Sequence, residues 1–286
     1  MNTANLQGVL GKDLEDGALD IRSIPTDQHA RHMSLEEAMP LLVSPEDKRP
    51  LRLSEDGLAL VSPGQRFPIR NGQPVLLPAD LLPYLGASKL DIPLEAARTP
   101  LLRHFLISSI KETQGVIAAA TNTHWHRRHI FRSRQLLRSA RGTVLDIGCG
   151  SARSSGTVFP AHTQYLGLDL APGKHNEFQL VATAEMLPLS DASVDNVSFL
   201  ASLDHILDYR TALEEAHRVL KPGGRLFISS LVWYEDAALF RDTRHFHHFR
   251  EADLSAGLRQ WSVEVYRKFI WKNDTHRESV YLAAIK

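Results

Sequence analysis

A glycine-broken turn follows a short apolar run and an acid in TVLDIGCGSARSSG, residues 143–156. Gly148 and Gly150 allow a close approach of the backbone, and the small residues after them favour the start of a helix. A strand, a glycine turn and a helix in this order bring backbone N–H groups towards a bound phosphate or nucleoside. A dinucleotide fingerprint needs a third glycine three residues after Gly150, where this chain has Arg153. The turn by itself is therefore a weak indication of a phosphate- or nucleoside-binding site and does not define a dinucleotide.

Two histidines are candidates for acid–base chemistry. His205 lies in ASLDHILD, directly after an expected strand, and His245 lies in DTRHFHHFREADL, after the next one. Histidine suits proton transfer because its ordinary pKa, about 6.5, is close to neutral pH. Structural roles fit the same positions: His205 as a hydrogen-bonding residue at a helix start, and His245 as a surface-loop residue that caps a neighbouring backbone group.

The most basic stretch is HWHRRHIFRSRQLLRSAR, residues 124–141, which has three histidines, six arginines and no acid. Arginines of this kind can contact nucleic-acid phosphates. Because the whole chain has no net charge, we expect a solvated helix face here instead. Histidine spacing without a carboxylate is a weak indication of a metal site, and the single cysteine, Cys149, excludes a cysteine cluster. No bound metal is expected.

The candidate residues need a sheet that brings their loops to one edge, and the chain from residue 143 onward has the pattern of such a sheet. Strands are expected over residues 143–148, 163–170, 178–184, 194–202 and 225–233, followed by a hairpin of residues 261–271 and 278–286. Apolar residues at helical spacing predict a helix before Pro222. The alternation predicts an α/β fold, with a Rossmann-like, doubly wound, mostly parallel sheet and an antiparallel terminal hairpin.

The composition is that of an ordinary globular protein, with 43% hydrophobic and 23% charged residues. A net charge of zero gives the whole chain no electrostatic preference for nucleic acid or an anionic membrane. The first twenty residues carry four acids and no long apolar run, which argues against a secretory signal. No stretch approaches the roughly 18 apolar residues of a membrane span. We expect a cytoplasmic protein that does not contact a membrane.

Motifs downstream of the turn narrow the choice of cofactor. Asp169, in YLGLDLAP, follows the turn by about twenty residues, where an acid accepts hydrogen bonds from ribose hydroxyls. VATAEMLPLSDASVDNV and LEEAHRVLKPGGRLFIS come next. Through these motifs, residues 144–230 resemble class I S-adenosylmethionine-dependent methyltransferases, whose pattern is D-x-G-x-G, G-x-D, D-A-x-x-L-P-F and R-x-L-K-P-G-G.

This resemblance implies S-adenosylmethionine as the cofactor and gives roles to residues at matching positions. It assigns Asp146, Gly148 and Gly150 to the methionine part, Asp169 to the ribose, Thr183, Ala184 and Glu185 to the adenine, and Ser202 to the transferable methyl group. Cys149 and Leu170 are implied as further cofactor-binding residues. His245 matches a histidine that overhangs the acceptor pocket in similar enzymes. Thr183 departs from the family pattern, because an acid usually accepts from the adenine amino group there and a hydroxyl accepts more weakly.

A second resemblance concerns the N-terminal part, where LLVSPEDKRPL and FPIRNGQPVLLP are similar to the zinc-ribbon-like activator proteins of tRNA and ribosomal methyltransferases. The matching residues are Phe67, Pro68, Ile69, Gly72, Pro74, Val75 and Leu76. Ser44, Asp47 and Ser62 stand where the family has metal-binding cysteines, and serine hydroxyls are poor zinc ligands. The resemblance therefore implies a metal-free version of the unit, which either activates the catalytic domain or only stabilises it.

Four regions follow from these patterns. Residues 1–33 are polar and are interpreted as a mobile arm. Residues 34–86 are predicted to be the small β-rich, activator-like domain, and residues 87–141 a helical connecting segment that contributes to the acceptor pocket. Residues 142–286 are predicted to be the S-adenosylmethionine-binding methyltransferase domain.

The leading functional hypothesis is a methyltransferase with a small-molecule or metabolic-intermediate acceptor, because the chain is neutral and lacks a recognisable nucleic-acid domain. The activator-like unit and the basic stretch favour an alternative, an RNA or protein methyltransferase. A third hypothesis is a non-catalytic partner protein that binds S-adenosylmethionine. The sequence specifies neither the acceptor atom nor the oligomeric state.

Overall fold

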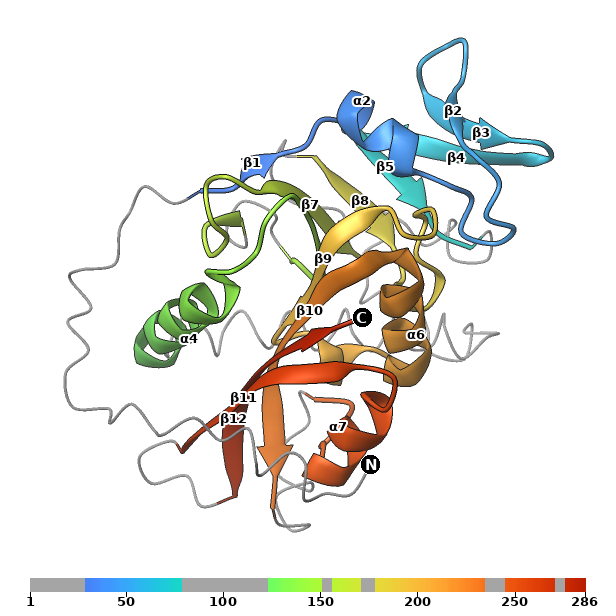
Figure 1. The fold of residues 1–286 in the computed structure, drawn as a ribbon. Helices are drawn as coiled ribbons and strands as arrows, with labels where there is room; N and C mark the ends of the chain where they lie inside the picture. The colour runs from blue at the N-terminus through green and yellow to red at the C-terminus, as the bar shows by residue number, and fades with distance from the viewer. Residues whose placement is uncertain (1–28, 79–122, 151–155, 171–177, 235–244, 271–275) are drawn as a thin grey trace, which may run out of the picture.

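The computed structural model describes residues 29–78, 123–150, 156–170, 178–234, 245–270 and 276–286 (Figure 1). The strands from the glycine turn onward are β6 (Thr143–Ile147), β7 (Gln164–Asp169), β8 (Gln179–Ala182), β9 (Val194–Leu200), β10 (Leu220–Trp233), β11 (Ser262–Ile270) and β12 (Arg277–Ile285). They lie in the order β8-β7-β6-β9-β10-β12-β11. The sheet is parallel from β8 to β10, and β12 runs antiparallel to both β10 and β11. The predicted fold class and its terminal hairpin are confirmed.

Helices cover both faces of this sheet, as a doubly wound fold requires. α4 (Thr123–Leu137) lies on one face, and α6 (Tyr209–Val219) and α7 (Glu251–Gly257) lie on the other (Figure 1). Successive residues of a strand face opposite sides of the sheet, so Val144 joins the buried cluster under α4 while Leu145 joins the cluster under α6. Two apolar cores thus fix the sheet from both sides.

Because β6, β7, β8 and β9 run parallel, their carboxyl ends lie at one edge of the sheet. Short 3-10 helices follow two of these ends: η6 (Ala184–Met186) after β8 and η7 (Leu203–His205) after β9. α6 begins at its cap Asp208, whose carboxylate accepts from the backbone N–H groups of Arg210 and Thr211. In parallel α/β sheets this edge is where ligands bind.

β10 begins earlier than the sequence predicts. The helix before it ends at Val219, and Leu220 already pairs with Val194 of β9. The register then shifts until Arg225 pairs with Asn196, so the intervening Pro-Gly-Gly segment forms an irregular stretch of the strand. Glycine and proline at a shift of this kind interrupt the ladder locally without ending the strand.

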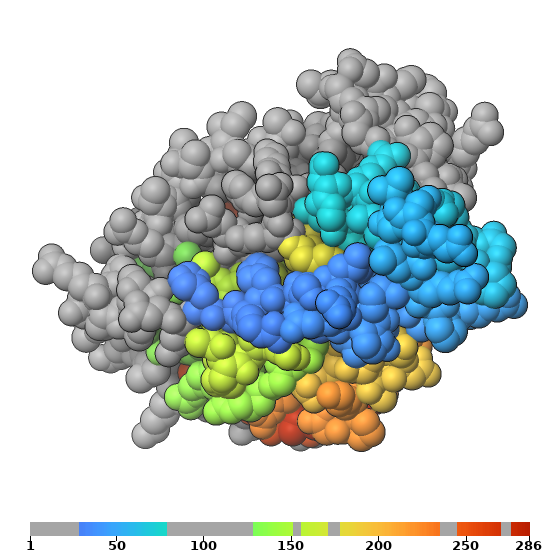
Figure 2. All heavy atoms as spheres, turned by 90° about the horizontal axis from the view of Figure 1, so that it is seen from above, coloured from blue at the N-terminus to red at the C-terminus, as the bar shows by residue number. Residues whose placement is uncertain are grey.

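The N-terminal unit contains α2 (Leu35–Ala38), η3 (Met39–Leu41) and the strands β2 (Arg52–Leu53), β3 (Ala59–Ser62), β4 (Gln65–Arg70) and β5 (Gln73–Leu76). β2 to β5 pair antiparallel in chain order, and β5 then pairs in parallel with β8. The unit is therefore β-rich as expected, and it extends the central sheet. In Figure 2 the blue and cyan atoms of this unit lie directly against the green and yellow atoms of the α/β part.

Two sequence-based expectations need correction. Residues 1–33 were expected to form a mobile arm, of which residues 1–28 lie outside the described residues; at its end, β1 (Arg31–His32) pairs in parallel with β7, and the His32 ring lies against Tyr165. The basic stretch was expected to present a solvated helix face, but Arg132 is buried with its guanidinium 3.6 Å from the centre of the Phe269 ring. Apolar stems and a cation–π contact account for this burial.

The remaining predictions for the helical connecting segment fall largely on residues 79–122, outside the described residues. The helix expected directly after the glycine turn also lies mostly outside them, at residues 151–155. None of the helices in the described ranges has the length and apolar character needed to cross a membrane.

Candidate active site

The glycine turn is held against the end of β9. Gly148 has a φ of +74°, and a Cβ built on it would lie 2.4 Å from Cβ of Ser202. The Ser202 hydroxyl donates a hydrogen bond of 2.6 Å to the carbonyl of Ile147. Only glycine can both adopt this conformation and tolerate this neighbour. The predicted methionine-pocket turn and the predicted methyl-side residue are thus in direct contact.

Asp169 ends β7 and is bound to the same turn. The backbone N–H of Gly150 donates to its Oδ2 at 2.8 Å. Gly150 has a φ of +58°, and no atom of the described residues lies within 4 Å of where its Cβ would be. Asp169 thus lies beside the glycine turn, its predicted role in ribose binding stays a prediction, and Leu170, the next residue, is half-buried.

Asp146 lies beneath the turn and is 1% exposed. The hydroxyl of Ser198 donates to its Oδ1 at 2.6 Å, and the Tyr165 hydroxyl donates to its Oδ2 at 2.8 Å. Burial raises the pKa of Asp146 to about 6, although both hydrogen bonds favour the ionised form. Asp146 thus holds the base of the turn together through β7 and β9.

Cys149 is buried in the apolar cluster on the α4 side of the sheet. Burial raises the pKa of its thiol, so the side chain is a neutral thiol at physiological pH. It behaves as a small apolar residue that shapes the turn and supplies no nucleophile.

The predicted adenine-side residues follow β8. The Thr183 hydroxyl is buried and has no hydrogen-bond partner among the described residues, and Ala184 beside it is buried. Glu185 faces α6, where its Oε1 accepts from the backbone N–H of Asp208 at 3.2 Å. Burial raises the pKa of Glu185. Of the three residues, Thr183 is the one with a buried polar group available to a ligand.

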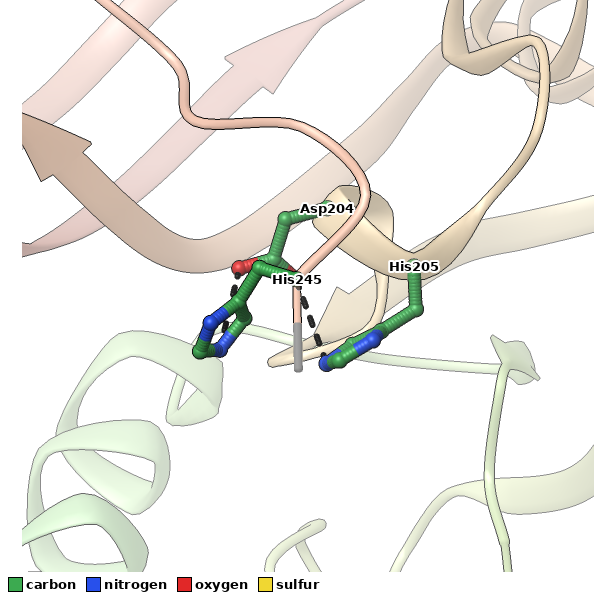
Figure 3. A group of neighbouring side chains, drawn as sticks. All are labelled: Asp204, His205 and His245. Atoms are coloured by element: carbon green, nitrogen blue, oxygen red, sulfur yellow. Dashed lines mark ion pairs between the residues drawn. The ribbon is translucent and has the colours of Figure 1, made fainter. Parts of the chain in front are cut away.

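Asp204, His205 and His245 form a second polar group, which we call the His–Asp cluster (Figure 3). Asp204 Oδ2 lies 3.8 Å from Nε2 of His245, and Asp204 Oδ1 lies 3.9 Å from Nε2 of His205. The two imidazole rings are 4.9 Å apart between centroids. The side chain of Asp204 is 3% exposed, whereas that of His205 is 38% exposed. The structure thus brings together the two predicted histidines, which are forty residues apart in the sequence.

Backbone hydrogen bonds hold His245 at this position. The N–H groups of Phe246 and His247 both donate to the carbonyl of Asp204, at 2.9 and 3.0 Å. Nε2 of His247 lies 2.7 Å from the carbonyl oxygen of Ile206, which fixes the loop to the segment after η7. Trp233, at the end of β10, is buried and packs against His245 with 5.9 Å between ring centroids.

Asp204 was not predicted from the sequence as a functional residue. The signal was present, because a carboxylate directly precedes His205 after a buried strand. The sequence does not indicate that the loop carrying His245 lies beside that carboxylate. Tyr165 and Ser198, the partners of Asp146, were missed for the same reason, since strand pairing brings them together.

The residues at this edge fit S-adenosylmethionine. Three features suit a nucleoside with a flexible amino-acid tail: a buried Thr183 hydroxyl and a space beside Gly150 that no described residue fills, and an acid bound to a left-handed glycine turn. Asp169 would hold the ribose, Thr183 the adenine, and the turn around Gly148 the methionine part. When bound, S-adenosylmethionine supplies an electrophilic methyl group on a sulfonium.

Comparison with known proteins gives the class of this domain. Residues 145–228 match the family model described as methyltransferase domain. O-methyltransferase resE of Aspergillus sclerotiorum is 35% identical over 112 residues, which are 34% of this chain and 42% of that protein. The ubiquinone biosynthesis O-methyltransferase of Idiomarina loihiensis is 31% identical over 101 residues, 31% of this chain and 42% of that protein. The chain thus spans less than half the length of these two curated relatives.

Among solved structures, the chain is similar to a 1,6-didemethyltoxoflavin-N1-methyltransferase of Burkholderia thailandensis with bound S-adenosylhomocysteine. The identity is 18%, the TM-score is 0.47, and the match covers 62% of this chain and 88% of that one. Residues 145–228 thus match a methyltransferase domain, and the observed strand order and glycine turn fit S-adenosylmethionine as its cofactor.

Proposed function

We propose that this chain is an enzyme that transfers the methyl group of S-adenosylmethionine to an oxygen atom of a small molecule. The observation that carries the proposal is the hydrogen bond from the Gly150 N–H to Asp169, at the edge where the buried Thr183 hydroxyl has no partner in the described ranges. Relatives named O-methyltransferases favour oxygen as the acceptor atom.

The chain contributes positioning and proton handling to this reaction. Methyl transfer is an in-line displacement, so the acceptor oxygen must be held opposite the sulfur and water must be excluded. Asp146, Gly148 and Ser202 fix the turn that would hold the methionine part. A hydroxyl acceptor loses its proton, and His205 and His245 are proposed as the groups that face it. Buried Trp233 beside His245 is proposed as an apolar wall for the ring of an aromatic acceptor.

Formation of S-adenosylhomocysteine tests this proposal. The purified chain is incubated with S-adenosylmethionine and a panel of hydroxylated aromatic compounds, with bulk tRNA and protein as parallel acceptors. We expect S-adenosylhomocysteine to form with at least one phenolic compound, and the rate to fall at least tenfold in His245→Ala. Turnover only with tRNA, weakened steeply by salt, would contradict a small-molecule acceptor and favour the RNA alternative.

We further propose that residues 34–78 are a metal-free, activator-like unit that stabilises the cofactor-binding edge. Val75 and Leu76 pair with β8, whose end leads directly to Thr183. At positions of the family's cysteines, Ser44 Oγ accepts from the Asp47 N–H at 3.4 Å, a local hydrogen bond within the unit. A Val75→Pro variant is expected to weaken S-adenosylhomocysteine binding several-fold, and an unchanged affinity would contradict this role.

A further inference from the structure

The distances within the His–Asp cluster distinguish between two kinds of site. The carboxylate lies 3.8 Å from His245 and 3.9 Å from His205, and a heavy-atom distance of 3.6 Å is already too long for a hydrogen bond. The two imidazoles therefore lie at ion-pair distance from the carboxylate, too far for a direct hydrogen bond to it. Oδ1 of Asp204 is buried and has no hydrogen-bond partner among the described residues. A buried carboxylate oxygen without a partner is unfavourable unless a ligand completes it.

The same distances suit a cation placed between the three residues. Two ligand atoms that each lie about 2.1 Å from one ion are at most about 4.2 Å apart. Both carboxylate–imidazole pairs meet this limit, and the ligand atoms of all three residues lie within 4.8 Å of one another. Tetrahedral ligands that lie about 2.1 Å from the ion are about 3.4 Å apart, so binding would draw these atoms together by about 0.4 to 1.4 Å.

We infer that Asp204, His205 and His245 bind one divalent transition-metal ion, with Zn²⁺ the best match. Two imidazoles and one carboxylate are a ligand set of catalytic zinc sites, which leave the fourth position for water or substrate. Mg²⁺ and Ca²⁺ prefer oxygen ligands and fit this set poorly. The ligands come from η7 and from the loop before α7, and the backbone hydrogen bonds to the Asp204 carbonyl fix that loop independently of the ion.

The role of this ion, unlike the site itself, rests on the proposed methyl transfer. The open position would take the hydroxyl oxygen of the acceptor and favour its deprotonated form, and the proton leaves to water. The oxygen then forms the new bond to carbon, the carbon–sulfur bond breaks, and the sulfur keeps the electron pair as a neutral thioether. His205 and His245 would act as ligands in this scheme, so the ion takes over the activation that a histidine base would otherwise provide.

Zinc titration of chelator-treated protein tests the site. We expect one Zn²⁺ per chain by calorimetry, and Co²⁺ substitution giving the visible absorption of a four- or five-coordinate site. Asp204→Asn, His205→Gln and His245→Gln should each weaken binding at least about 100-fold, because loss of a ligand exceeds the 10- to 100-fold effect of an outer-shell change. His162→Gln is the matched control, since His162 is exposed and precedes β7 at the opposite edge of the sheet.

A second test compares the melting temperatures of the wild type and of Asp204→Asn, each with and without Zn²⁺. Without metal, Asp204→Asn should fold and unfold at the same or a higher temperature than the wild type, because it removes a buried carboxylate whose Oδ1 forms no hydrogen bond with a described residue. At 100 times the dissociation constant, Zn²⁺ should raise the wild-type Tm by about 5 °C and leave the variant unchanged.

Weak zinc binding of variable stoichiometry that survives Asp204→Asn would overturn the metal site. S-adenosylhomocysteine titrations of the same samples separate the two proposals. If this nucleoside binds and zinc does not, the metal site is wrong and the methyltransferase proposal stands. If zinc binds and the nucleoside does not, the metal site stands and its role in methyl transfer falls.

Discussion

Asp146 gives the sharpest quantitative prediction, because burial raises its pKa from an ordinary 3.8 to about 6. A raised pKa means that the folded protein binds this proton more tightly than the unfolded chain does. The stability contributed by the neutral acid is therefore complete below about pH 4 and is lost as pH rises through about 6. Each pKa unit corresponds to about 1.4 kcal/mol, so ionised Asp146 lowers the free energy of unfolding by about 3 kcal/mol at pH 7.5.

Asp146→Asn removes this titration while keeping the shape of the side chain. Ser198 and Tyr165 have hydroxyl groups that donate or accept, so both contacts can be rearranged around an amide. We expect the variant to be more stable than the wild type by about 3 kcal/mol at pH 7.5 and about equal to it at pH 4. Urea unfolding of both proteins at the two pH values measures the difference.

The exposed Asp191→Asn variant serves as the control, because its surface ion pair with Arg218 contributes at most about 1 kcal/mol. A stability difference between Asp146→Asn and the wild type that is the same at pH 4 and pH 7.5 would refute the reasoning. It would show that Asp146 has the same protonation state in the folded and unfolded chains across this range.

Three further predictions concern the site. Gly148→Ala should weaken S-adenosylhomocysteine binding at least tenfold by calorimetry, because the added Cβ would collide with Ser202. Gly72→Ala is the control: Gly72 has the same φ of +74°, but no described atom lies within 4 Å of the added Cβ, so this variant should affect stability alone. Thr183→Val should weaken that binding several-fold without lowering Tm, since the buried hydroxyl has no partner among the described residues; an unchanged affinity would argue against an adenine contact. His247→Ala should lower kcat about tenfold with the affinity for S-adenosylhomocysteine unchanged, because the loop that carries His245 loses its contact with the Ile206 carbonyl; equal losses of both would contradict a positioning role.

The features that follow local rules were predictable from the sequence. Apolar residue patterns and the helix-ending Pro-Gly-Gly segment predicted strands β6 to β12 and α6, with ends within a few residues of the observed ones. The nearness of Asp169 to the glycine turn follows from a local rule too, because a parallel strand pair places the end of one strand beside the turn after its neighbour.

Features that depend on distant chain segments were not predictable. Asp204 meets His245 only because the N–H groups of Phe246 and His247 bind the Asp204 carbonyl, and backbone contacts of this kind leave no mark on residue types. Arg132 is buried because the terminal hairpin brings Phe269 under its guanidinium, which a basic sequence pattern does not indicate. The pairing of β5 with β8 likewise joins segments about a hundred residues apart.

Binding of S-adenosylhomocysteine to the purified chain, measured by calorimetry, tests the central claim most directly. The account predicts binding with one site per chain, at least tenfold weaker in Asp169→Asn and unchanged in Asp191→Asn, with NAD giving no comparable heat. Preference for NAD, or binding that is indifferent to Asp169, would contradict the assignment of this edge of the sheet to S-adenosylmethionine.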